Sequence, residues 1–144
     1  MFPRKNLMLM EGPHCKDMVC PPPSENITPK VIASTALLAD LNHMDREIRG
    51  INRSVDHCYW LADDAYTGYV FESGGNLVGY AYISQQGFIA PVLAVRDTFL
   101  PDIIAHCMRL LKDNYDVAPK MLLNGKNFSS LQLLLNHGFQ IKEI

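Results

Sequence analysis

Three histidines, His57, His106 and His137, could exchange a proton near neutral pH and are the first candidates for acid–base chemistry. His57 falls in the first turn of a predicted helix, and His137 directly precedes Gly138, which is expected to end another helix. Polar side chains at helix ends commonly hydrogen-bond the backbone groups that have no partner inside the helix. We therefore predict a surface or capping role for each histidine rather than a catalytic one.

The cysteines offer thiol and metal-binding chemistry. Cys58 and Cys107 lie inside apolar helical patterns, which predicts two small buried side chains. His14, Cys15 and Cys20 could form part of a metal site, but no second close pair of ligands accompanies them. We expect free thiols in a flexible linker and no bound metal. A metal or redox protein that uses Cys15 and Cys20 is therefore the least favoured of three possible functions for this chain.

Composition narrows the class of protein. The chain has 144 residues, of which 48% are hydrophobic and 19% are charged, as in a globular domain. Its net charge is −2, and no run of lysine and arginine occurs, so we expect no nucleic-acid partner. No apolar stretch is long enough to span a membrane, and the N-terminus does not match a signal peptide. These features predict a cytoplasmic protein with no membrane partner.

The centre of the sequence predicts three consecutive strands that would hold a site. Thr67–Glu72 and Asn76–Ser84 are rich in aromatic and β-branched residues. Ser73–Gly75 between them predicts a hairpin turn, because glycine adopts positive φ without steric cost. Phe88–Val95 is almost entirely apolar, which is typical of a strand covered on both faces. We expect the functional site where this third strand ends.

Two helices are predicted before these strands. Ser34–Gly50 has apolar residues at helical spacing: Leu37, Leu41, Met44 and Ile48. The charged residues among them are expected on the solvent side: Asp45, Arg46, Glu47 and Arg49. Ser54–Ala62 predicts a second helix that faces the sheet with three residues: Val55, Tyr59 and Trp60. These helices would cover one side of the sheet.

The pattern after the third strand alternates between helix and strand. A helix capped by Asp97 or Thr98 should run to about Tyr115, followed by a strand over Val117–Leu123. A helix over Phe128–Asn136 and a short strand over Phe139–Ile144 complete the series. Because a strand–helix–strand unit usually makes parallel strands, we predict an α+β fold, a mixed α/β architecture with a mixed sheet flanked by helices.

The N-terminal segment has a different character. Phe2–Met10 is a short apolar piece that could be one strand. Glu11–Pro29 is rich in proline and predicts a linker, partly in extended polyproline form. We therefore divide the chain into residues 1–29, an N-terminal strand and linker that could derive from a preceding domain, and residues 30–144, one domain.

The stretch NGKNFSSLQLLLNHGF near the end resembles a late motif of the GNAT family, the GCN5-related N-acetyltransferases. In that motif an Asn precedes a helix, and Gly-Phe opens the next strand; Asn127 and Gly138-Phe139 match it. Arg49–Leu61 resembles the opening of the second module in tandem GNAT proteins, in which the preceding domain ends on a strand similar to Phe2–Met10. The resemblance implies a GNAT-like acyl-CoA N-acyltransferase fold whose last strand is missing after Ile144. Phe2–Met10 could fill that place, in cis or from a second copy.

The resemblance also implies a binding site for acetyl-CoA as cosubstrate. Its cofactor-binding residues would be Leu93 and Val95 through their backbone, together with Arg96 and Asn127. Asn127 could instead cap the helix that follows it, and Arg96 could instead be solvated or form an ion pair with Asp97. Two positions of the expected diphosphate loop hold Phe99 and Pro101 in place of glycine, and two carboxylates, Asp97 and Asp102, lie beside them. Leu134 stands where many members of the family have the Tyr that protonates CoA, so no catalytic residue is assigned.

Two functions therefore stay open. The first is a GNAT-family N-acetyltransferase that transfers an acetyl group from acetyl-CoA to an amine of a small molecule or protein. The second is a non-catalytic GNAT-like module for association or ligand sensing, which would form a homodimer or pack on a partner GNAT domain. The sequence leaves open whether the chain is an enzyme, and it identifies no particular amine substrate.

Overall fold

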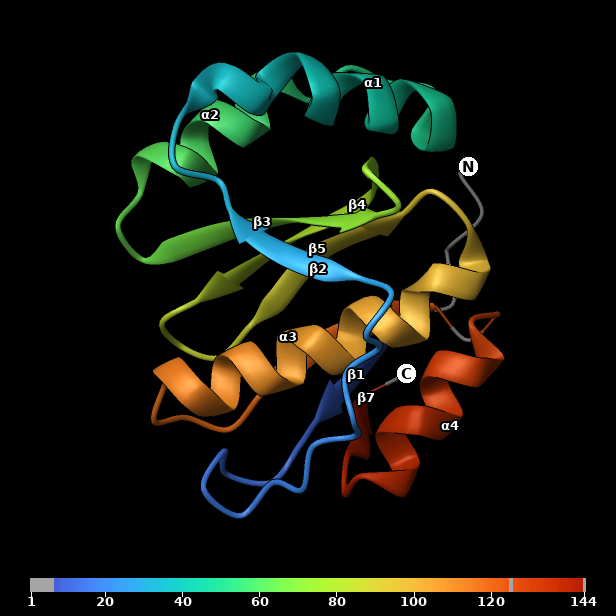
Figure 1. Cartoon of the computed structure of the whole chain (residues 1–144). Helices are drawn as coiled ribbons and strands as arrows, with labels where there is room; N and C mark the ends of the chain where they lie inside the picture. The colour runs from blue at the N-terminus through green and yellow to red at the C-terminus, as the bar shows by residue number, and fades with distance from the viewer. Residues whose placement is uncertain (1–6, 125, 144) are drawn as a thin grey trace, which may run out of the picture.

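Two antiparallel sheets form the centre of the protein in a computed structural model that describes residues 7–124 and 126–143 (Figure 1). The larger sheet has the strand order β2-β3-β4-β5, with bounds Thr28–Val31, Tyr66–Ser73, Asn76–Ser84 and Ile89–Ala94. The smaller sheet has the order β6-β1-β7, with bounds Lys120–Asn124, Leu7–Glu11 and Gln140–Glu143. A single parallel bridge, Phe88 to Lys120, joins β5 to β6. The predicted α+β class is confirmed. Of the parallel strand pairing that a mixed sheet would have, the described residues show this one bridge.

Helices cover both sides of the larger sheet (Figure 1). α1 and α2 lie on one side and α3 on the other, while α4 lies beside the smaller sheet. Their bounds are Leu38–Arg49, Ser54–Ala62, Leu100–Asn114 and Phe128–Asn136. Short 3₁₀ turns, Thr35–Leu37 and Asp97–Phe99, precede α1 and α3. All four helices were expected from the spacing of their apolar residues.

The three central strands form the predicted meander. Gly74 and Gly75 have φ values of 59° and 82°, which favours the tight turn between β3 and β4. β4 then pairs with β5 on its other edge. Side chains alternate between the two faces of β4, so Ile83 lies in the core under α3 while Tyr82 lies in the core under α1 and α2. The sheet therefore separates two apolar layers.

β1 is the central strand of the smaller sheet, between β6 and β7. Met8 and Met10 are buried and pair with Leu123 and Met121 of β6. Leu7–Glu11 thus completes this sheet in cis, in its middle rather than at its edge, while residues 2–6 of the predicted strand lie outside the described residues. The division of the chain at residue 29 stays a prediction, but its first part contributes core residues to the second.

The segment predicted as a flexible linker is partly ordered and buried. Cys15, Met18 and Ile27 belong to the core, and Cys15 Sγ lies 2.9 Å from the carbonyl oxygen of Tyr115. Its end also contributes to β2, the edge strand of the larger sheet, which includes Pro29. Because an edge strand leaves one side unpaired, it can accept a proline, and the last two residues of the predicted linker, Thr28 and Pro29, lie in this strand.

The inward face of α2 differs from the prediction. Val55 and Tyr59 are 83% and 64% exposed, whereas His57 is fully buried against the sheet. Trp60 does face the sheet, where its ring lies 4.9 Å from the ring of Tyr82. Cys58 is exposed and not buried as expected. The inward face of α2 is therefore formed by His57, Trp60 and Leu61.

Candidate functional site

A cleft opens between the two sheets where β5 and β6 diverge. Beyond the Phe88–Lys120 bridge, which is held by a 2.9 Å bond from Lys120 N to the carbonyl oxygen of Gly87, the two strands separate. The space encloses a cavity of about 480 Å³, called the cleft cavity below. Residues that line it include Arg49, Trp60, Tyr66, Ser84, Phe88–Val92, Leu100, Met121–Asn124 and Asn127. This opening explains why most of β5 is only half-buried, although the sequence predicted a fully covered strand.

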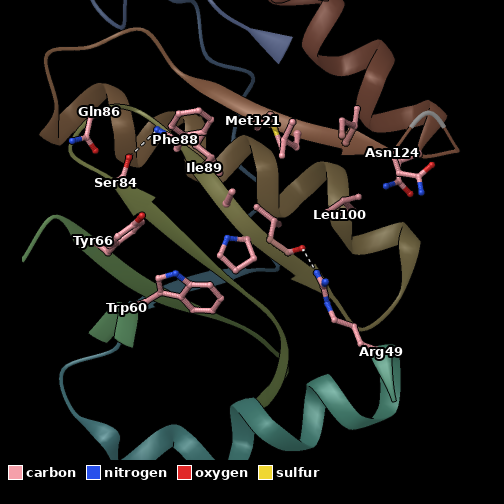
Figure 2. Close-up of a pocket in the computed structure, with 16 residues that line it drawn as sticks. Arg49, Trp60, Tyr66, Ser84, Gln86, Phe88, Ile89, Leu100, Met121 and Asn124 are labelled. Atoms are coloured by element: carbon pink, nitrogen blue, oxygen red, sulfur yellow. Dashed lines mark hydrogen bonds between the residues drawn. The ribbon is translucent and has the colours of Figure 1, made fainter. Parts of the chain in front are cut away.

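Side chains from both sheets and from three helices, α1, α2 and α3, point into the cleft cavity (Figure 2). Trp60 of α2 and Tyr66 of β3 form an aromatic wall, while Leu100 and Met121 supply apolar surface on the opposite side. Arg49 reaches from the end of α1 towards β5, and its Nη2 atom donates to the carbonyl oxygen of Val92 at 3.5 Å. A mostly apolar cavity with a few polar groups is the usual form of a small-molecule site.

The backbone of β5 turns hydrogen-bonding groups towards this cleft. Val95 N donates to the carbonyl oxygen of Val78 on β4 at 2.9 Å, so this N–H is turned away from the cleft. Because backbone groups alternate in direction along a strand, the N–H groups of Val92 and Ala94 face β6 and the cleft. The carbonyl of Val92 also faces the cleft, as its contact with Arg49 shows.

The four predicted cofactor-binding residues lie in different places. Asn127 lines the cleft cavity and an adjoining hollow of about 280 Å³, which Leu93 also lines. Val95 and Arg96 line a separate hollow between α1 and the β3–β4 hairpin. Arg96 therefore does not share a cavity with Asn127. The backbone groups of Leu93 and Val95 are turned towards β4, where Val95 N bonds to Val78 and Leu93 pairs with Tyr80, so they do not face the cleft as expected. The cofactor-binding role of Arg96 and Asn127 stays a prediction.

Asn127 occupies the N-cap position of α4, but its side chain makes no capping hydrogen bond. Its carbonyl oxygen accepts from Leu131 N at 2.9 Å, as the backbone of any N-cap residue does. The alternative in which the Asn127 side chain caps the helix is therefore not observed, and the side chain is left to line the cleft cavity. Nor does Asp97 or Thr98 cap α3 as predicted, because Asp97–Phe99 form a 3₁₀ turn before it.

The start of α3 carries acidic and bulky residues where an anion would approach. Asp97 lines the adjoining hollow together with Leu100 and Arg49. Phe99 packs against the main core, and Pro101, in the first turn, has no N–H to donate. A helix N-terminus normally attracts phosphate, but a carboxylate in the same place opposes it.

Side chains that exchange protons near neutral pH are absent from the described lining of the cleft cavity. It includes no Asp, Glu, His or Cys, and its only phenol is that of Tyr66. Leu134, at the position where many GNAT enzymes have a tyrosine, is fully buried in the core. The geometry therefore offers binding groups but no evident general acid or base.

A buried polar network lies directly behind the aromatic wall. Asp45, His57, Tyr80 and Tyr82 are all fully buried. The Asp45 carboxyl group accepts from the Tyr80 hydroxyl at 2.6 Å and lies 2.7 Å from His57 Nε2. His57 Nδ1 lies 2.7 Å from the Tyr82 hydroxyl. Every group finds a partner if Nε2–H donates to Asp45 and Nδ1 accepts from Tyr82.

This network corrects two predictions, because Asp45 and His57 were both expected at the surface. Burial, with Asp45 nearby, raises the pKa of Tyr80 and of Tyr82 well above the ordinary value, so both phenols keep their protons. One signal was present in the sequence: Asp45 follows Leu41 by four residues, which places it on the apolar stripe of α1. The ring of Trp60 separates the network from the cleft cavity, with Tyr82 at 4.9 Å and Arg53 at 4.9 Å from its centre.

The other histidines have structural contacts. His137 ends α4 and its Nδ1 lies 2.8 Å from the carbonyl oxygen of Leu133, which confirms a capping role. His106 is buried, with Nε2 3.0 Å from the carbonyl oxygen of Ser24, so its predicted surface role is wrong.

One group of potential metal ligands lies in the N-terminal segment. His14, Cys15 and Asp116 bring their ligand atoms within 4.8 Å of one another. The ammonium group of Lys16 lies 3.5 Å from Asp116, however, and repels a cation at that place. Cys20, the other cysteine considered for a metal site, is not among these residues.

As for membranes, none of the helices within residues 7–124 and 126–143 has the length and apolar character needed to cross one.

Comparison with solved structures shows a GNAT-like fold. A GCN5-related N-acetyltransferase from Kribbella flavida aligns with a TM-score of 0.60 at 13% identity over 98% of this chain and 55% of its own. A GCN5-related N-acetyltransferase-like protein from Streptococcus suis aligns with a TM-score of 0.53 at 16% identity, over 96% and 60%. A Drosophila protein aligns with a TM-score of 0.69 at 10% identity, over 96% and 48%.

These likenesses show the fold alone, since all three identities are low. The chain spans about half to three-fifths of the length of the structures it matches. No protein-family model matches the sequence, and no curated protein matches it significantly.

Proposed function

We propose that this chain binds acetyl-CoA, with the pantetheine arm in the cleft between β5 and β6, as an N-acetyltransferase domain of the GNAT type. The observation that carries the proposal is the edge of β5, where the backbone groups of Val92 and Ala94 face a cavity instead of a neighbouring strand. A pantetheine arm has two amide groups, and it would pair with such an edge as an added strand does.

The remaining contacts of the cosubstrate divide into a favourable and an unfavourable part. The apolar walls of the cleft cavity, such as Leu100 and Met121, suit the aliphatic arm and an acetyl group. The diphosphate would lie near the start of α3, where Asp97 repels it and Pro101 supplies no N–H. We therefore expect the arm to contribute most of the affinity and the diphosphate to contribute little.

For catalysis, this chain would hold the thioester beside an acceptor amine and exclude water with its apolar walls. Acyl transfer also needs an amine that has lost its proton and a proton for the departing thiolate. The described lining supplies only the hydroxyl groups of Tyr66 and Ser84 for such transfers, and Ser84 Oγ already accepts from Phe88 N at 3.1 Å.

The second candidate is a GNAT-like module that binds a ligand or a partner without turnover. It is favoured by the buried Leu134 and by the lack of Asp, Glu, His, Cys and Lys side chains for proton transfer in the described lining. Association with a second copy or with another GNAT domain, and a cytoplasmic location, stay predictions.

Calorimetric titration with acetyl-CoA and with pantetheine tests the binding proposal. Leu122 is 50% exposed and lines the cleft cavity, so Leu122→Trp would narrow it with little cost to the core. Leu135 is 46% exposed on α4 and does not line it, so Leu135→Trp is the matched control. We expect Leu122→Trp to weaken both ligands at least tenfold and Leu135→Trp to leave them unchanged.

No binding of either ligand by the unaltered protein at millimolar concentration would refute the proposal. Equal effects of the two tryptophan variants on ligand affinity would refute the placement of the ligand in the cleft cavity. Binding without acetylation of any amine in a broad panel would establish the non-catalytic module in place of the enzyme.

A further inference from the structure

Charge in the cleft cavity is unevenly distributed. Of its described lining residues, Arg49 is the only one that carries a formal charge at neutral pH. The other polar groups there are the neutral side chains of Tyr66, Ser84, Gln86, Asn124 and Asn127. A ligand in this cavity therefore meets a single positive charge among apolar and neutral polar surfaces.

Arg49 has unused hydrogen-bonding capacity. Its one hydrogen bond among the described residues is the 3.5 Å contact with the carbonyl oxygen of Val92. A guanidinium group has five N–H donors in a planar fork that matches a carboxylate or a phosphate. Nearby Arg53, in contrast, pairs with Asp56 at 3.3 Å and also stacks on Trp60.

The carboxyl groups around the cavity do not neutralise Arg49. Asp45 is buried behind the aromatic wall with Tyr80 and His57, and Asp56 pairs with Arg53. Asp97 lines the adjoining hollow with Arg49, but no ion pair within 4.0 Å joins them in the described part of the chain. A positively charged ligand would therefore meet repulsion, and an anionic group would find an open partner.

We propose that Arg49 binds the carboxylate of a small ligand whose apolar body lies against Trp60 and Tyr66. This inference rests on the proposed function, in which the ligand is the acceptor: a compound with both an amino group and a carboxylate. Arg49 lies at the rim, beside both the cleft cavity and the adjoining hollow (Figure 2). From there it holds the carboxylate at the rim while the rest of the ligand extends along the aromatic wall. Polyamines and lysine-rich peptides are disfavoured acceptors by the same charge argument.

Three probes that share a phenyl group and differ in charge test this assignment: phenylalanine, 3-phenylpropionate and 2-phenylethylamine. Binding is measured by ligand-observed NMR titration on the full chain, without acetyl-CoA. We expect the two carboxylates to bind at least tenfold more tightly than phenylethylamine. Arg49→Gln should remove this preference and Arg49→Lys should retain part of it, since lysine keeps the charge but not the fork. Arg46→Gln, on the exposed side of the same helix, is the matched control and should keep it.

Equal binding of the three probes, or a preference that survives in Arg49→Gln, would overturn the proposal. The donor's phosphates are the other anions that could use Arg49. If Arg49→Gln weakens acetyl-CoA but not pantetheine, and leaves the preference among the phenyl probes intact, the carboxylate assignment is wrong. The probes contain no thioester, so their binding can hold even where acetyl-CoA and pantetheine fail to bind, which separates this inference from the proposed function.

Discussion

Replacement of Tyr80 by phenylalanine tests whether the buried network stabilises the fold. The change removes one hydroxyl group and leaves Asp45 Oδ1 without the 2.6 Å hydrogen bond that it accepts. Asp45 is fully buried, so water cannot replace the lost donor. Loss of one hydrogen bond to a buried charged or strongly polar group costs about 1.5–3 kcal/mol, and a whole domain is stable by only about 5–15 kcal/mol. We expect Tyr80→Phe to lower the free energy of unfolding by ~2 kcal/mol.

Urea denaturation followed by fluorescence measures this cost. The chain has a single tryptophan, Trp60, whose ring contacts Tyr82 at the edge of the network, so its emission reports on this region. Tyr59→Phe is the matched control, because Tyr59 is on α2 and 64% exposed. It should change the free energy of unfolding by less than about 0.5 kcal/mol, as surface substitutions usually do.

A double-mutant cycle with Asp45→Asn separates the pair from its surroundings. If the hydroxyl stabilises through Asp45, the two changes together should cost less than the sum of their separate costs by about 1 kcal/mol or more. A cost of Tyr80→Phe no larger than that of Tyr59→Phe, with an unchanged dependence on urea, would refute the reasoning that this hydrogen bond contributes to stability.

Three further predictions follow from burial and close contact. Burial raises the pKa of Tyr69 to about 12 and raises the pKa of Tyr80, Tyr82 and Cys107 above their ordinary values, so the folded state keeps protons that the unfolded chain releases. The free energy of unfolding should therefore fall as the pH rises above about 9, where the unfolded thiol and then the unfolded phenols ionise, by about 1.4 kcal/mol per pH unit for each group, as urea titrations across this range would show. A profile with no fall above about pH 10 would contradict the burial of these side chains. Met10→Ala should cost about 2–5 kcal/mol in the same assay because Met10 is fully buried in β1, while a cost below 1 kcal/mol would show that β1 is not a core strand. Asp97→Asn should raise the affinity for acetyl-CoA several-fold in calorimetry but not that for pantetheine, because it removes a negative charge near the expected diphosphate; an equal gain for both ligands would place the diphosphate elsewhere.

Local pattern was sufficient to predict most elements. The expected bounds of the helices Ser54–Ala62 and Phe128–Asn136 agree with the structure, as do those of β4. These segments have strong apolar periodicity and clear turn residues, such as Gly75, so local preference and tertiary packing agree. β2 was not predicted, because Pro29 argues against a central strand. A strand at a sheet edge can contain proline, but the edge position of β2 depends on its pairing with β3, which is far away in the sequence.

The candidate site depended on facts that local pattern does not contain. Asp45 was assigned to solvent by residue type, but Tyr80 and His57, which satisfy its carboxyl group, come from two other elements. The cleft cavity exists because β5 and β6 separate beyond Lys120, and no residue type in either strand indicates that separation. Which backbone groups of β5 face the cleft likewise follows from its register with β4.

The position of β1 has a consequence for how the chain folds. The smaller sheet joins residues 7–11 to residues 120–124 and 140–143, so its central strand meets its neighbours across almost the whole described length. The meander of β3, β4 and β5 involves only local contacts and can form early, whereas the smaller sheet must wait until the last strand has left the ribosome. Until β6 has been synthesised the methionine-rich strand β1 has both edges unpaired, and one edge stays unpaired until β7 follows. Docking of this strand is therefore expected to be the slow, rate-limiting step of folding.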